Sequence, residues 1–162
     1  MLFVTFQLDR HRFAIDASTI REVLPLVDVR PMPQAPPGIA GVFDFRGTPV
    51  PVVDLSLLVT GRASERCLST RLLLVGYEDR TGASRSLGVV VEHATRTIRR
   101  QESDFFESGL ASAAAPYLGR ITRDEGELVQ CLDVRRLLPS TVRDVLFAPQ
   151  VEAEWPPISQ TC

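Results

Sequence analysis

Short runs of alternating apolar and polar residues dominate the chain and predict an all-β fold. The first run, "LFVTFQL" at 2–8, is followed by the polar turn "DRHR" and a returning run at 12–16. Similar runs cover 39–54, 71–91 and 118–132, and short turns containing glycine or charged residues interrupt each of them. Alternation with a period of two is typical of strands that bury one face, so we expect a series of hairpins.

Only a few short helices are expected between these strands. "STIREVL" predicts one to two helical turns, in which Thr19 and Glu22 have the spacing of a capping box and Ile20 faces the core. "LSLLV" predicts a second helix with Asp54 as its N-cap. "STVRDVLFA" predicts a last helix near the end of the chain.

Two parts of the chain repeat one layout at an offset of 79 residues. Gly47 and Gly126 each occupy a hairpin turn, and seven residues later Asp54 and Asp133 each precede a short helix with paired leucines. We therefore expect Gly47 to take a positive φ and both aspartates to cap helix starts. The two glycines and the two aspartates are structural residues in this interpretation.

The repeat predicts two small barrels packed together, each with about five short strands. Approximate limits are 1–62 for the first barrel and 70–148 for the second, with an exchange of strands between them left open. A single sandwich of ten strands is the alternative. Residues 149–162 are expected to form a C-terminal tail outside the folded domain.

The hairpin "GVFDFRGTPVPVVDL" carries the most informative turn of the chain. Pro49 and Pro51 remove two N–H donors from the same edge of one strand, so this strand belongs at a sheet edge or at the open seam of a barrel. Asp44 and Arg46 project outward from the hairpin. Arg46 either forms a weak ion pair with Asp44 or binds a carboxylate or carbonyl of a partner protein.

Composition and charge narrow the function. The net charge is −2, all eighteen basic residues are arginines, and they are dispersed, which argues against nucleic acid as a partner. The three cysteines match no metal-binding spacing, and His11 and His93 lie in or beside turns without a catalytic motif. We expect no enzyme, no metal and no other cofactor. No leader or membrane-spanning stretch is visible, which favours a cytoplasmic setting.

Three segments in this order, "FAIDASTIREVL", "GIAGVFDFRGTPVPVVDLSLLV" and "LDVRRLL", resemble the CheW-like domain family of bacterial chemosensory systems. The resemblance covers about residues 3 to 147 and suits a stand-alone adaptor. It implies two SH3-like five-stranded barrels joined through a shared apolar interface. It also implies a scaffold without catalysis, which bridges the cytoplasmic tip of a methyl-accepting chemoreceptor and a CheA-type histidine kinase in membrane receptor arrays.

The resemblance also implies residue roles. Arg46 falls on the arginine that the family uses in array contacts, and Glu22 and Ile20 fall on the acidic and apolar positions near the receptor groove. Asp44 stands where the family usually has asparagine, and we expect it to hold Arg46 internally. Such departures favour a specialised, non-flagellar pathway. The alternatives are a self-assembling scaffold that binds no receptor and a nucleic-acid-binding double barrel.

Overall fold

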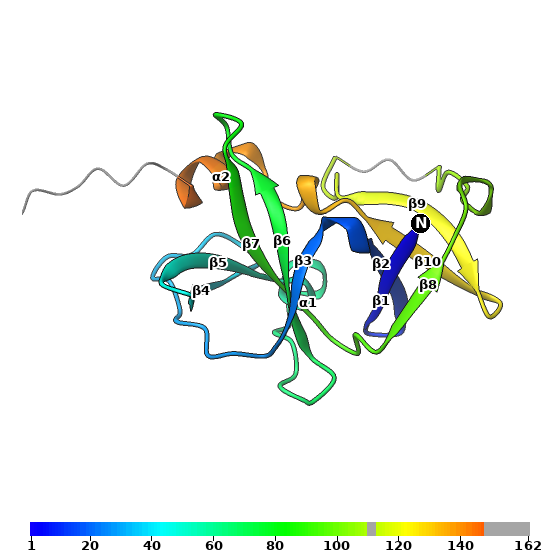
Figure 1. Cartoon of the computed structure of the whole chain (residues 1–162), viewed down its shortest axis with the longest axis horizontal. Helices are drawn as coiled ribbons and strands as arrows, with labels where there is room; N and C mark the ends of the chain where they lie inside the picture. The colour runs from blue at the N-terminus through cyan, green and yellow to red at the C-terminus, as the bar shows by residue number, and fades with distance from the viewer. Residues whose placement is uncertain (110–112, 148–162) are drawn as a thin grey trace, which may run out of the picture.

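The computed structural model describes residues 1–109 and 113–147, which form two lobes side by side (Figure 1). The strands are β1 (Leu2–Leu8), β2 (His11–Asp16), β3 (Ile20–Pro25), β4 (Ile39–Phe45), β5 (Thr48–Asp54), β6 (Arg71–Glu78), β7 (Ser84–Val91), β8 (Arg96–Arg99), β9 (Leu118–Asp124) and β10 (Glu127–Leu132). The helices are α1 (Leu55–Thr60), α2 (Ser140–Leu146) and the 3-10 turns η1 (Ala17–Thr19), η2 (Glu102–Asp104) and η3 (Val134–Arg136).

The strands form two five-stranded sheets, which confirms the expected fold class. The first sheet has the order β8-β1-β2-β10-β9 and the second has the order β3-β6-β7-β5-β4. In both sheets a hairpin is joined to another hairpin by one parallel pair, β2 with β10 and β5 with β7. The two orders become the same when β1–β5 are exchanged with β6–β10, so the repeat seen in the sequence is a repeat of topology.

The limits expected from the repeat, 1–62 and 70–148, do not coincide with the two sheets. The first sheet combines β1 and β2 with β8, β9 and β10, and the second combines β3, β4 and β5 with β6 and β7. Each sheet therefore takes two strands from one repeat and three from the other. The edge strand β3 pairs with the hairpin β6–β7, which opens the second repeat. The edge strand β8 pairs with the hairpin β1–β2, which opens the first repeat.

Single bridges bring the two edges of each sheet together. Arg30, which follows β3, pairs with Val42 on β4, and Phe106, which follows β8, pairs with Ile121 on β9. Both pairs connect the chain beyond one edge strand to the other edge strand of the same sheet. The segment "VDVRPM" at 27–32 contributes this single bridge at Arg30.

The prolines of β5 lie where the sheet is open. β5 pairs with β4 along its length, but its pairing with β7 covers only Val52–Asp54. Pro49 and Pro51 precede this parallel segment, so their missing N–H groups cost no ladder hydrogen bond. The expectation of an open seam holds for the first half of β5, and the second half lies inside the sheet.

The buried apolar side chains form three clusters, and one of these joins the two sheets. Along β6 the side chains alternate between two of them. Leu72 and Leu74 belong to a cluster confined to the second sheet, whereas Leu73 and Val75 join a cluster shared by both sheets. A third cluster, which includes Phe3 and Val129, lies within the first sheet. Full burial of one such side chain contributes about 1.5–3 kcal/mol, so the shared cluster fixes one sheet against the other.

The segment "STIREVL" is not a helix, contrary to the prediction. Only η1 is helical, and there the Asp16 carboxylate accepts a hydrogen bond from the Ser18 N–H at 2.9 Å in place of the expected capping box. Ile20 and Glu22 lie on β3, which pairs antiparallel with β6. Ladder hydrogen bonds and burial of alternate residues outweigh the local helical preference of this segment.

Candidate partner-binding site

The turn between β4 and β5 positions Arg46. Arg46 and Gly47 have φ values of 52° and 84°, the left-handed pair that a tight hairpin turn requires, and the expected positive φ of Gly47 is confirmed. The carboxylate of Asp44 accepts a hydrogen bond from the Gly47 N–H at 2.7 Å. Asp44 therefore anchors the turn from within.

Arg46 pairs with Glu22, not with Asp44 as expected. Its Nη2 atom lies 3.5 Å from Oε1 of Glu22, and its guanidinium carbon lies 4.8 Å from the centre of the Phe45 ring. The Arg46 side chain is 76% exposed and that of Glu22 is 38% exposed. An ion pair this exposed contributes about 0–1 kcal/mol to folding, so a partner protein can replace it at low cost.

Ile20 does not belong to this exposed pair. It lies opposite Val75 on β6 and packs against the apolar cluster shared by the sheets. On the same strand Val23 is 51% exposed. Sequence reasoning missed Phe45, whose ring faces the Arg46 guanidinium. The exposure of Val23 follows from strand alternation once β3 is recognised as a strand.

The second sheet's ion pair has a counterpart in the first sheet with the charges reversed. Glu125 occupies the equivalent turn before Gly126, with φ values of 51° and 80°, and binds Arg96 on β8 through two hydrogen bonds of 2.9 and 3.0 Å. Glu22 and Arg96 hold equivalent positions in the two sheets, as the paired residues across the strands show. In the second sheet the neighbours across the strands are Glu22, Leu74, Gly88 and Val52, and in the first sheet they are Arg96, Thr5, Ala14 and Cys131.

The two aspartates predicted as caps differ in the number of hydrogen bonds that they accept. Asp54 caps α1 through the Leu57 N–H at 3.3 Å and also accepts hydrogen bonds from the N–H and the hydroxyl of Ser64 at 2.8 and 2.5 Å. Asp133 caps η3 through the Arg135 N–H at 3.0 Å. Both predictions are confirmed, and Asp54 in addition ties the loop after α1 to the second sheet.

A cluster of charged side chains lies beside the β9–β10 turn. Asp124 is 10% exposed and accepts hydrogen bonds from Arg12 at 2.8 Å and from Arg100 at 2.6 Å. These two guanidinium groups, that of Arg12 first, hold the pKa of the Asp124 carboxyl below its usual value. The arrangement fixes β9 to β2 and to the chain after β8.

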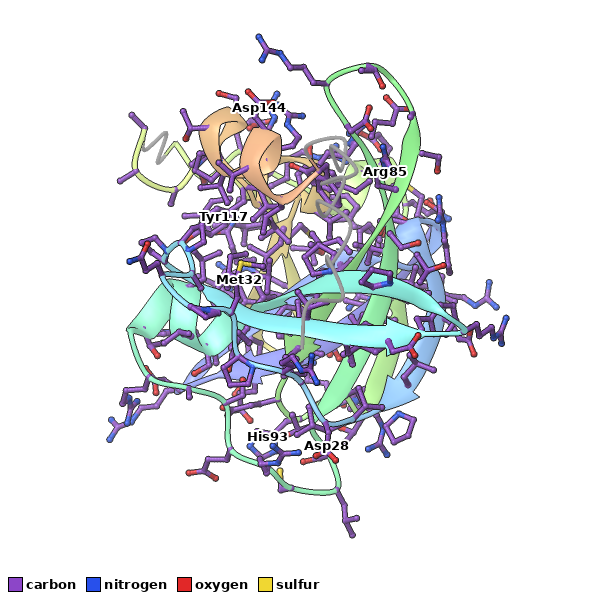
Figure 2. The ribbon with its side chains drawn as sticks, turned by 90° about the vertical axis from the view of Figure 1, so that its left-hand side faces the viewer. Asp28, Met32, Arg85, His93, Tyr117 and Asp144 are labelled. Atoms are coloured by element: carbon purple, nitrogen blue, oxygen red, sulfur yellow. The ribbon has the colours of Figure 1, made fainter. Side chains whose placement is uncertain are left out.

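The described residues offer neither a cluster of metal ligands nor a membrane-spanning helix. Within the described residues, no three or more His, Cys, Asp and Glu side chains are grouped to hold a metal ion. No helix in that part of the chain is long and apolar enough to cross a membrane. His93 is exposed, and Figure 2 shows it at the end of the molecule opposite Arg85 and Asp144.

Residues 2–142 match the family model described as a CheW-like domain, from the first strand into α2. The chain belongs to the CheW-like domain family. The chemotaxis protein CheW of Treponema pallidum (strain Nichols) is 26% identical over 139 residues, covering 85% of this chain and 81% of that protein. The CheW of Rhizobium meliloti (strain 1021) is 22% identical over 143 residues, covering 87% and 89%.

A solved structure supports the fold of this CheW-like chain. The crystal structure of the scaffolding protein TtCheW from Thermoanaerobacter tengcongensis aligns with a TM-score of 0.76 at 19% identity. The alignment covers 90% of this chain and 92% of that chain. Because the match includes almost all of both chains, the two-sheet arrangement described above is that of a whole CheW-like domain.

Proposed function

We propose that this protein is a cytoplasmic adaptor that couples a methyl-accepting chemoreceptor to a CheA-type histidine kinase and is recruited to membrane receptor arrays. The match of residues 2–142 to the CheW-like family carries this proposal. The chain acts as a scaffold without catalysis, without a cofactor and without nucleic acid as a partner. The departures noted in the sequence, Asp44 among them, favour a specialised, non-flagellar pathway.

The fold suits a rigid connector between two partners. The shared apolar cluster, which includes Phe13, Ile15, Leu73 and Val89, fixes the two sheets against each other. A receptor and a kinase that bind to different outer surfaces are then held at a constant distance and orientation. A receptor signal changes kinase activity only if the adaptor complex binds one receptor state more tightly than the other.

The Arg46–Glu22 pair is the proposed recognition site. Arg46 is exposed and fixed in direction by a hairpin turn that Asp44 anchors. A guanidinium group can bind a carboxylate through two parallel hydrogen bonds, so a partner's acidic side chain competes effectively with the single long contact to Glu22. Glu22 in turn becomes available to a basic group of the partner.

Co-purification tests the proposal directly. The tagged full chain, expressed in its own cell, is expected to retain a CheA-type kinase and a chemoreceptor in the same eluate, and each is expected to bind when added alone as a purified protein. Recovery of neither protein would refute the adaptor function. Light scattering of the isolated chain identifies the alternative of a self-assembling scaffold, and binding to an oligonucleotide that strengthens as salt falls identifies the nucleic-acid-binding alternative.

A further inference from the structure

A polar cavity of about 450 Å³ lies where segments from both sequence repeats meet. Its walls come from η1, β3, β6, β7, η3 and α2, and the side chains relevant here are Arg21, Tyr77, Glu78, Ser84, Arg135 and Arg143. Figure 1 shows α2 beside the upper ends of β6 and β7, and Figure 2 shows the same region from the side, with α2 marked by Asp144. The three arginines and one glutamate give this cavity a formal charge of +2.

Arg21 is fixed in the cavity without losing its charge. It occupies the irregular position of β3 between Ile20 and Glu22, where the pairing register with β6 shifts. Such irregularities redirect a side chain. The guanidinium of Arg21 donates hydrogen bonds to the hydroxyls of Ser84 and Ser86, which hold it in place but do not neutralise it.

Gly76 makes room for this guanidinium. A Cβ atom added at Gly76 would lie 3.0 Å from Nη2 and 3.1 Å from Nε of Arg21, closer than side chains normally approach. A glycine on a strand interior weakens the strand, so its presence is explained by a close approach of another group. Here that group is the charged end of Arg21.

Arg143 provides a second cation without an acidic partner. Its Nε atom is buried and has no hydrogen-bond acceptor among the described residues, and its guanidinium lies 5.8 Å from the centre of the Tyr77 ring. Tyr77 is 2% exposed, and its hydroxyl also lacks a partner within the described residues. Buried N–H and O–H groups are rarely left unpaired in folded proteins, because each costs about 1–3 kcal/mol.

Seven of the eighteen arginines have no carboxylate partner among the described residues, and Arg21 and Arg143 are two of them. Eleven of the arginines in the described residues form an ion pair with a carboxylate, including Arg135 at the cavity rim with Asp133. Neither Arg21 nor Arg143 is among these. The guanidinium groups of Arg21 and Arg143, the hydroxyls of Ser84 and Tyr77 and the carboxylate of Glu78 line the same space.

We propose that this cavity binds the phosphate group of a small molecule, with Arg21 and Arg143 as its principal ligands. Phosphate accepts several hydrogen bonds, and the planar fork of arginine matches its geometry. The cavity volume lies within the range of small-molecule sites, so it holds the phosphate and part of the group attached to it. This binding activity goes beyond the adaptor function and does not depend on Arg46.

Titration calorimetry on the full chain with inorganic phosphate, at constant ionic strength set with sodium chloride, tests the proposal. Saturable binding is expected, and Arg143→Met and Arg21→Met should each weaken it at least tenfold. Arg66→Met is the matched control, since it removes the same charge from the exposed pair with Asp28 and should leave the affinity unchanged.

Gly76→Ala is a second variant that keeps every charge. Because its Cβ displaces the Arg21 guanidinium, it should also weaken phosphate binding while the far-ultraviolet circular dichroism spectrum remains that of the wild type. Phosphate binding that does not saturate, or that is equal in the wild type, Arg143→Met and Gly76→Ala, would overturn the proposal. Acetate binding more tightly than phosphate would also overturn it, because the cavity would then be a carboxylate site.

Discussion

Glu22 on β3 and Arg96 on β8 occupy equivalent positions in the two sheets and carry opposite charges. Each binds the residue at the equivalent hairpin turn, Glu22 with Arg46 and Arg96 with Glu125. The two lobes thus share a backbone plan, while the charges on their turns are reversed. Charge differences of this kind allow partners to distinguish surfaces of similar shape, since like charges repel and opposite charges steer association.

Replacement of Arg46 by glutamate should weaken partner binding without unfolding the domain. The side chain is 76% exposed and its ion pair with Glu22 is a weak surface pair, so we expect the free energy of unfolding to change by less than about 1 kcal/mol. Binding of the purified receptor or kinase should fall at least tenfold. Thermal unfolding followed by circular dichroism and pull-down with each partner measure the two effects.

The double variant Arg46→Glu with Glu22→Arg separates recognition from internal pairing. It restores an ion pair between positions 22 and 46 but exchanges the two charges. If a partner recognises Arg46 itself, binding remains lost in the double variant. Recovery of binding to the wild-type level would instead mean that the internal pair, not the arginine, is what the partner requires.

Substitution of Gly47 should destabilise the fold through its backbone alone. Nothing lies within 4 Å of a Cβ atom built at this position, so there is no steric clash to relieve, but φ is 84°. A β-branched residue in this left-handed region costs about 1–2 kcal/mol, and asparagine costs less. Urea unfolding should therefore show Gly47→Val less stable than Gly47→Asn. Equal stability of these two variants and the wild type would contradict the turn geometry.

Alanine at Asp54 should cost more than alanine at Asp133. The carboxylate of Asp54, a residue 6% exposed, accepts hydrogen bonds from Leu57 and Ser64, so its removal leaves partly buried donors unpaired. We expect a loss of about 2 kcal/mol for Asp54→Ala and about 1 kcal/mol for Asp133→Ala, the usual cost of a helix cap. Chemical denaturation of both variants under one condition gives the comparison, and a larger loss at Asp133 would refute it.

Local signals in the sequence predicted the turns and caps but not the partners across the sheets. Gly47 and Gly126 are recognisable because a tight hairpin turn needs a left-handed residue, and Asp54 and Asp133 because a helix start needs an acceptor. β3 was misread as a helix because its residues also fit a helical pattern. Its pairing with β6, about fifty residues away, is decided by the tertiary structure and is invisible to local propensity.

The site shows the same limit. The sequence singled out Arg46 and Glu22 separately, through a family resemblance, but paired Arg46 with its near neighbour Asp44. The structure assigns Asp44 to the Gly47 N–H, which leaves Arg46 to Glu22. No local motif marks Arg21 or Arg143, because their cavity is assembled from segments that lie far apart in the chain.

Acid should destabilise the protein in part through Asp124. Arg12 and Arg100 lower the pKa of this carboxyl in the folded state, so the unfolded chain takes up the proton more readily. The stabilisation is complete above the ordinary aspartate pKa near 4 and is lost as the pH falls through the lower folded-state value. Asp124→Asn should be less stable than the wild type at pH 7, and its stability should fall less steeply between pH 5 and pH 2.

Urea midpoints measured at pH 7, 5, 4, 3 and 2 test this dependence. Asp28→Asn is the control, since this carboxylate is fully exposed and its ion pair is with the exposed Arg66. Its acid profile should follow that of the wild type. A profile of Asp124→Asn that runs parallel to the wild type over the whole range would show that the cluster with Arg12 and Arg100 contributes nothing to the acid sensitivity.

Separate expression of the two sequence repeats should give no folded sheet from either piece. A fragment of residues 1–65 holds β1–β5, but β1 and β2 find their partners β8 and β10 only in the other fragment, and β3 and β5 lack β6 and β7. Each fragment also exposes its half of the shared apolar cluster. We therefore expect a non-cooperative thermal transition for 1–65 and for 66–148 alone, and a cooperative one after they are mixed in equal amounts. A cooperative transition in either fragment alone would mean that a repeat folds by itself. The exchange of β1–β2 and β6–β7 between the repeats would then not be required for folding.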